Sequence, residues 1–290
     1  MQHIQRSRVV RQLYILIDKH YRGKTMYNII KSLNYNARRD MVIIIALITI
    51  FAFPFFALFL VGQIEGDSFD EMTGAVYYVS QLGENFIVAM FVILVVACRI
   101  CGSDAGDKTI NYEFLSGHNR ASIYWARIIA GMLWSVLITM FLFYLPLVVF
   151  SAVNGWGQEV EVRDAVIRLC LALLPAMRLS AFLMMLTMIL RSAGRGIAMG
   201  YGAIMVMVIV TSILGDVMNL DLTWQFAFTN VMTLLTLSNS RNIVVDGETV
   251  VRFESSLSPG MVAGTIIASV VVSLIYTYFA YVLFKKKDRD

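Results

Sequence analysis

The chain has 290 residues, of which 58% are hydrophobic and only 15% are charged, whereas a typical soluble domain is roughly 25% charged. Its mean hydropathy is +0.70, and a soluble core of this length has too little interior to hide so much apolar surface. The same composition excludes a disordered chain and a disulfide-rich secreted scaffold. We therefore expect an all-α membrane protein that crosses the bilayer several times.

The first forty residues are basic and amphipathic. Apolar residues recur there at helical spacing, at Met26, Ile29, Ile30 and Leu33, with lysines and arginines between them. Such a connecting helix is expected to lie in the inner membrane interface against anionic headgroups, and docking onto a partner protein is the alternative. No removable signal peptide is expected, because residues 1–40 lack an apolar core followed by a cleavage site.

Six stretches are long and apolar enough to span a bilayer, which requires about 20 residues each. They are Met41 to Val61, Val76 to Ala97, Ile123 to Val149, Val166 to Leu190, Ile197 to Leu214, and Met261 to Phe284. Together they define a transmembrane region over residues 41–284, followed by a basic tail at 285–290. Glycines near the start of the fifth stretch predict a close approach between helices there: Gly194, Gly196, Gly200 and Gly202.

The distribution of charge predicts the orientation of these stretches. With both termini inside, 19 of the 24 lysines and arginines fall on the inner side beside seven acidic residues, and the outer side carries four basic and 13 acidic residues. This asymmetry follows the positive-inside rule and requires an even number of spans. The sequence predicts six transmembrane helices with both termini in the cytoplasm, in the plasma membrane of a bacterial cell.

The longest external segment, residues 216–258, carries two expected elements. Leu222 to Leu237 is typical of an amphipathic or partly re-entrant helix, with interfacial aromatics near its start: Trp224, Phe226 and Phe228. Residues 243–251 contain an Asp-Gly pair flanked by β-branched residues, which predicts a hairpin with a type I′ turn. Either element is a candidate for substrate contact, and a cap without such contact is the alternative.

The sequence lacks the patterns that a membrane enzyme or ATPase requires. Its three histidines lie outside the apolar stretches, and neither a metal-binding H-E-x-x-H helix nor a G-x-x-x-x-G-K-[S/T] loop is present. The Cys98-x-x-Cys101 pair stands alone, so buried packing is a better interpretation than zinc or redox chemistry. We expect no catalytic site, no metal and no nucleic-acid partner.

Two charges are predicted to lie within the membrane. Glu84 and Arg178 stand about 22 Å and 20 Å above the inner boundary by helical rise, where an unpaired charge costs several kcal/mol. The hypothesis is that they face one water-filled substrate path; the alternative places Glu84 in a loop and lets Arg178 snorkel. Met184 and Met188 are candidates for the same path because methionine suits adaptable apolar surfaces, although helix packing is the more common role.

The cytoplasmic segment at 99–122, between the second and third stretches, resembles a known family. The residues that carry the resemblance are Thr109, Ile110, Leu115, Ser116, Gly117, Arg120, Ile123 and Tyr124. They match the corresponding loop of ABC-2 type permeases, the membrane subunits of one class of ATP-binding-cassette exporter. The chain departs from that pattern at Lys108, Asn119 and Arg127, where the family usually has Gly, Ser and Lys.

The resemblance implies a coupling helix that docks in a groove of a separate ATPase subunit and transmits its closure to the spans. The residues expected to make this contact are Thr109, Ile110, Glu113, Phe114, Leu115 and Arg120. It further implies two copies of that ATPase, which bind ATP and Mg, and a second permease chain in a homodimer or heterodimer. The exported substrate would be amphipathic or hydrophobic: an antimicrobial or toxic peptide, a drug or a lipid. The alternative is an ATP-independent immunity or scaffold protein that sequesters a peptide.

Overall fold

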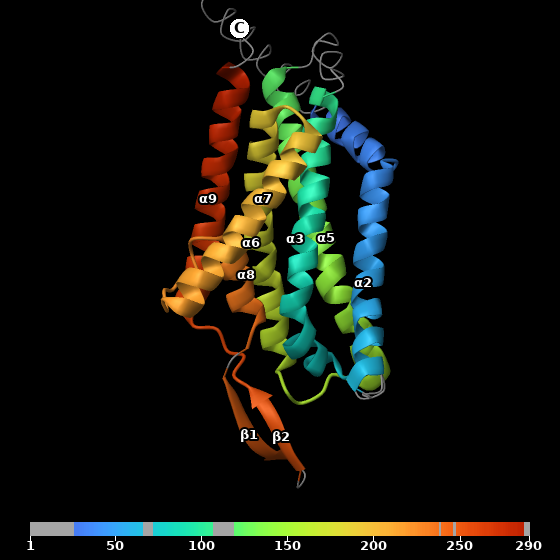
Figure 1. The fold of residues 1–290 in the computed structure, drawn as a ribbon, viewed down its shortest axis with the longest axis vertical. Coiled ribbons are helices and arrows are strands. Elements are labelled where there is room, and N and C mark those ends of the chain that lie inside the picture. The colour runs from blue at the N-terminus through green and yellow to red at the C-terminus, as the bar shows by residue number, and fades with distance from the viewer. Residues whose placement is uncertain (1–25, 66–71, 107–118, 238, 246–247, 287–290) are drawn as a thin grey trace, which may run out of the picture.

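The computed structural model describes residues 26–65, 72–106, 119–237, 239–245 and 248–286, and it is mostly helical. Figure 1 shows long helices side by side in a bundle, with a β-hairpin projecting beyond one end. After a helix over residues 26–37, the elements are α2 (Met41–Glu65), α3 (Gly74–Gly106), α5 (Arg120–Asn154), α6 (Val162–Leu190), α7 (Ala193–Thr211), the π-helix η2 (Ser212–Val217), α8 (Ala227–Leu235), β1 (Ser240–Val245), β2 (Glu248–Phe253) and α9 (Pro259–Lys286).

Helix α6 occupies the centre of the bundle. It packs against α3, α5, α7, α8 and α9, whereas α2 packs mainly against α3 and α5. One continuous set of buried apolar side chains joins these helices. A polar side chain on α6 therefore lies within reach of several other elements.

Five of the described helices are long and apolar enough to cross a membrane: Gly74–Gly102, Arg120–Asn154, Val162–Leu190, Ala193–Gly215 and Pro259–Lys285. They coincide with the last five stretches expected from the sequence, which are thereby confirmed as membrane-length helices. The first stretch corresponds to α2, whose described apolar part, Met41–Phe53, is shorter. A span at α2 stays a prediction, and so does the orientation of the bundle.

The glycines of α7 lie on two different faces. A Cβ atom at Gly196 would lie 2.6 Å from Thr187 Oγ1 on α6, and one at Gly200 would lie 2.3 Å from Leu94 Cδ1 on α3. Gly194 and Gly202 face open space. The predicted close approach is therefore confirmed for the two glycines four residues apart, which share one helix face, and is wrong for the other two.

An ion pair lies at the junction between the helix over residues 26–37 and α2. Ile29 and Leu33 of this helix are buried, as their spacing predicts. Asp40 caps α2 through its Oδ1 atom, which accepts a hydrogen bond from the Val42 N–H at 2.9 Å. Its Oδ2 atom lies 2.5 Å from Nη2 of Arg99 on α3. The amphipathic segment is thus fastened to both α2 and α3.

The segment before α8 differs from the expected helix over 222–237, because α8 begins only at Ala227. Phe226 has an extended backbone, and residues 223–225 form a turn. The Thr223 hydroxyl and backbone N–H hold the pKa of Asp221 below its ordinary value. Phe228 is buried and stacks on Phe86 of α3 at 6.2 Å, so its predicted role as an interfacial anchor is wrong.

The hairpin is antiparallel, with Val245 opposite Glu248 and Ser240 opposite Phe253. Its strands extend beyond the predicted range of 243–251 at both ends. The Phe253 N–H donates to the Glu159 carbonyl at 2.8 Å, so the base of the hairpin is fixed to the connection between α5 and α6.

Candidate functional site

Most of the predicted ATPase-coupling residues lie outside the described residues: Thr109, Ile110, Glu113, Phe114 and Leu115. Arg120 is described; it is the first residue of α5 and is exposed. Asn119 caps this helix by accepting a hydrogen bond from the Ala121 N–H at 3.1 Å. The contact with an ATPase stays a prediction from the sequence.

Arg178 lies near the middle of α6 and is only 3% exposed. Its Nη1 atom donates to the Trp224 carbonyl at 3.0 Å, and its Nη2 atom donates to the Gln225 carbonyl at 2.5 Å. This arginine therefore joins α6 to the turn before α8.

The pairing of Arg178 with Glu84 is corrected by the structure. Glu84 is exposed on α3, and among the described residues no ion pair joins it to Arg178. The buried polar residue at this level is its neighbour Asn85, which donates to the Tyr77 hydroxyl at 2.6 Å. Backbone carbonyls, rather than a carboxylate, stabilise the Arg178 guanidinium.

Met184 and Met188, the other predicted substrate-path residues, lie further along α6. Met184 is fully buried, and its Sδ atom would lie 2.3 Å from a Cβ atom placed on Gly131 of α5. Met188 is partly buried against the same core. Both contacts agree with helix packing, so the predicted role of these methionines in a substrate path has no support from their positions.

A second arginine on α6 was not singled out in the sequence. Arg168 is 6% exposed; its Nε atom donates to the Ser255 carbonyl at 2.7 Å and its Nη1 atom to the Leu234 carbonyl at 2.9 Å. The Ser255 hydroxyl donates to Asp164 Oδ2 at 2.8 Å. We call these four residues the outer clamp, because they hold α6, the end of α8 and the chain after β2 together.

A signal for Arg168 was present in the sequence. Arg168 interrupts an apolar run from Val166 to Leu171. It precedes Arg178 by ten residues, so the two positions lie less than a right angle apart around the helix. Arg168 lies within the predicted fourth stretch, Val166 to Leu190, although it is one of the four basic residues counted on the outer side.

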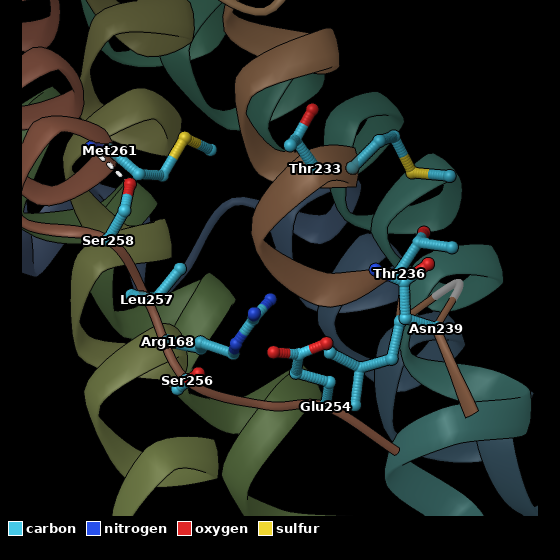
Figure 2. Close-up of a pocket in the computed structure, with 11 residues that line it drawn as sticks. Arg168, Thr233, Thr236, Asn239, Glu254, Ser256, Leu257, Ser258 and Met261 are labelled. Carbon is cyan, nitrogen blue, oxygen red and sulfur yellow. Dashed lines mark hydrogen bonds between the residues drawn. The ribbon is translucent and has the colours of Figure 1, made fainter. Parts of the chain in front are cut away.

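A pocket of about 640 Å³ adjoins the outer clamp, and we call it the outer pocket (Figure 2). Figure 2 shows the side chains of Arg168 and Glu254 pointing toward one another across it. Within the described ranges they form no ion pair. Hydroxyl and amide groups make up much of the remaining wall, from Thr233, Thr236, Asn239, Ser256 and Ser258.

A second pocket, of about 230 Å³, adjoins Arg178, and we call it the middle pocket. Its lining comes from α6, α7, α8, the turn before α8, and α9. Apart from Arg178, Gln225 and the Tyr276 hydroxyl, this lining is apolar: Leu179, Phe182, Ala203, Val206, Met207, Val210, Phe226 and Ala227. The arrangement offers a cation to one end of an otherwise apolar ligand.

Neither pocket is lined by a cluster of metal-binding side chains. Across the described ranges, no group of three or more His, Cys, Asp or Glu residues is arranged to hold a metal ion. What the pockets do offer is hydrogen bonding, charge and apolar surface, which are the elements of a binding site.

A family model described as "Protein of unknown function (DUF2705)" matches residues 20–289. No curated protein matches the chain. The matched range includes both arginines and both pockets.

Proposed function

This chain belongs to DUF2705, a family of proteins of unknown function, and we propose that it is the permease subunit of an ATP-binding-cassette exporter. The observation that carries the proposal is the pair of buried arginines on α6, each beside a pocket. A charge within a membrane span costs several kcal/mol. Charges at such positions typically mark a path for a substrate or ion.

The two pockets support an amphipathic or hydrophobic substrate. The middle pocket is apolar with one cation, whereas the outer pocket combines hydroxyl, amide and charged groups with apolar side chains, at Met232, Leu237, Leu257 and Met261. A membrane-active peptide, a drug or a lipid has both kinds of surface. Such a substrate would leave the bilayer at the level of Arg178 and reach water near Arg168.

The energy for export is proposed to come from another polypeptide, since the sequence has no P-loop. The resemblance of the 99–122 segment to ABC-2 permeases supports two copies of an ATPase subunit that bind ATP and Mg. A second permease chain, identical or related, would complete the path, and this chain itself would have no catalytic site.

The proposed topology has α2 as the first of six spans and both termini in the cytoplasm of a bacterial cell. Figure 1 supports this arrangement, since the ends of α3, α5 and α9 that carry Arg99, Arg120 and Lys285 lie opposite the hairpin. Basic residues at one end of a bundle are typical of the cytoplasmic side.

The test is purification of the intact complex from native membranes, followed by mass spectrometry and an assay of ATP hydrolysis in proteoliposomes. We expect a P-loop ATPase to be recovered with the chain, and amphipathic peptides or lipids to stimulate ATP hydrolysis. Phe114→Asp should abolish recovery of the ATPase, because a charge on the predicted coupling helix opposes docking in an apolar groove.

The matched control is Val251→Asp, which adds the same charge to an exposed residue on the hairpin. It should leave recovery of the ATPase unchanged. The proposal fails if no P-loop ATPase is recovered, or if Phe114→Asp and Val251→Asp behave alike.

The alternative is an ATP-independent immunity or scaffold protein, which the polar outer pocket favours because a peptide can bind there without transport. In that case the chain would protect cells from a membrane-active peptide when no partner ATPase is expressed. Export predicts that this protection is lost without the ATPase.

A further inference from the structure

Arg178 is a buried cation whose charge the surrounding protein leaves uncompensated. Its hydrogen-bond partners are the carbonyls of Trp224 and Gln225, which are neutral, and Tyr276 lines the same pocket. In the part of the chain that the structure describes, no carboxylate forms an ion pair with it. Hydrogen bonds to neutral groups offset part of the desolvation cost, and an anion would offset more.

The middle pocket provides the space beside this cation. Its volume of about 230 Å³ is smaller than the roughly 300–1,000 Å³ of sites for drug-sized ligands. One apolar chain therefore fits better than the two chains of a bilayer phospholipid. Val206 lines the pocket and is 60% exposed on α7, so the pocket opens sideways, toward the region that lipid would occupy around a membrane-length helix.

We infer that the middle pocket binds a single-chain anionic amphiphile, whose acid group pairs with Arg178 and whose acyl chain fills the pocket and leaves it past Val206. Charge complementarity selects the acid group, and the apolar lining from α6, α7 and α9 selects the chain. Either a carboxylate or a phosphate monoester supplies the acid group, because the guanidinium fork binds both. The inference gives the proposed substrate a chemical class, but it rests on Arg178 and its pocket and needs no ATPase.

The experiment measures binding to the full-length chain in nanodiscs of neutral phosphatidylcholine, with empty nanodiscs subtracted. The probe is cis-parinaric acid, a fluorescent fatty acid, and the matched neutral probe is the alcohol with the same chain. We expect saturable binding of the acid that is at least tenfold tighter than that of the alcohol, since a hydrogen bond between two charged groups is stronger than one to a neutral hydroxyl.

Three variants separate charge from shape. Arg178→Gln should weaken binding of the acid roughly tenfold or more and leave that of the alcohol unchanged. Ala203→Phe fills the pocket while keeping the charge, so it should weaken both probes. Ile209→Phe is the control; this residue is 55% exposed on α7 but does not line the pocket, so both affinities should stay at the wild-type value.

Competition then identifies the source of the anion. Displacement of the probe by dodecanoate or by dodecyl phosphate, but not by dodecanol, supports the inference and shows whether a carboxylate or a phosphate is preferred. Equal affinities for the acid and the alcohol in the wild-type chain would overturn it, as would full acid binding by Ala203→Phe. If Arg178→Gln does not fold, these two results still decide the question. Because no ATPase or nucleotide is present, the result is independent of the exporter proposal.

Discussion

Arg168 and Arg178 lie ten residues apart on the same central helix, are both almost completely buried, and have different surroundings. Arg168 binds carbonyls from two distant segments, at Leu234 and Ser255, with the Asp164 carboxylate in the same cluster. Arg178 binds two adjacent carbonyls of one turn and has no carboxylate among its partners. The same side chain thus serves as a structural link in one place and as an available cation in the other.

The difference follows from what each arginine connects. The outer clamp ties α6 to residues 66 and 87 positions away in the sequence, so its loss would release the end of α8 and the base of the hairpin together. The hydrogen-bond partners of Arg178 lie in one short turn, and the helix around it is also held by extensive packing against α9. We therefore expect Arg168 to stabilise the outer end of α6, and Arg178 to serve in ligand binding at the middle of this helix.

The largest expected effect is the loss of the outer clamp through Arg168→Ala. This change leaves the carbonyls of Leu234 and Ser255 without their donor, and each buried group without a partner costs about 1–3 kcal/mol. We expect a loss of about 3 kcal/mol in the free energy of unfolding, and faster proteolysis of the hairpin. Thermal unfolding in detergent micelles and limited proteolysis measure the two effects.

The control for that variant is Arg163→Ala, which removes the same side chain from an exposed position on α6. It should change the unfolding temperature little, because exposed charges away from special contacts rarely contribute more than about 0.5 kcal/mol. Equal effects of the two variants would show that the outer clamp does not stabilise the fold.

A smaller effect distinguishes fixed from adjustable contacts between the helices. Alanine at Gly102 would bring its Cβ atom within 2.7 Å of the Ala193 backbone nitrogen, whereas alanine at Gly131 meets the flexible side chain of Met184. Overpacking against backbone costs about 1–3 kcal/mol, and the end of a methionine side chain can move aside. Gly102→Ala should therefore lower thermal stability more than Gly131→Ala, and the reverse order would contradict this interpretation.

Much of this fold is predictable from the sequence because the relevant signals are local. Apolar runs of membrane length predicted five helices that the structure contains, and an Asp-Gly pair between β-branched residues predicted the hairpin. The four-residue spacing of Gly196 and Gly200 is likewise a local signal of one packed helix face.

The partners of the two arginines were not predictable in the same way. Both bind backbone carbonyls, and any residue carries a carbonyl, so neither Trp224 nor Ser255 shows a pattern that identifies it as a partner. A charged side chain such as Glu84 was the visible candidate, but it lies on the exposed face of α3. Pairing by side-chain charge overlooks the hydrogen-bonding capacity of the main chain.

A still smaller loss of stability is expected when only the side-chain hydrogen bond of the outer clamp, between Ser255 and Asp164, is removed. In Ser255→Ala the carbonyl that Arg168 binds remains, and only the hydroxyl that donates to Asp164 is lost. We expect a loss of about 1 kcal/mol, the usual net contribution of one hydrogen bond. Ser256→Ala, at the exposed neighbouring residue, is the control in the same thermal unfolding measurement and should have no effect.

The smallest expected effect comes from replacing Arg178. It tests the contrast with Arg168 most directly, because both variants replace an arginine on α6. Arg178→Met removes two hydrogen bonds to carbonyls, but these belong to the half-buried Trp224 and the exposed Gln225, whereas the carbonyls left by Arg168→Ala belong to the buried Leu234 and Ser255. Methionine also suits the apolar lining of the middle pocket. Removing a buried charge also removes its desolvation cost, which offsets the lost hydrogen bonds. We therefore expect the unfolding free energy to stay within about 1 kcal/mol of wild type, in the same detergent and without added ligand. A loss as large as that of Arg168→Ala would mean that Arg178 also holds the fold together, and that its burial gives no indication of a ligand.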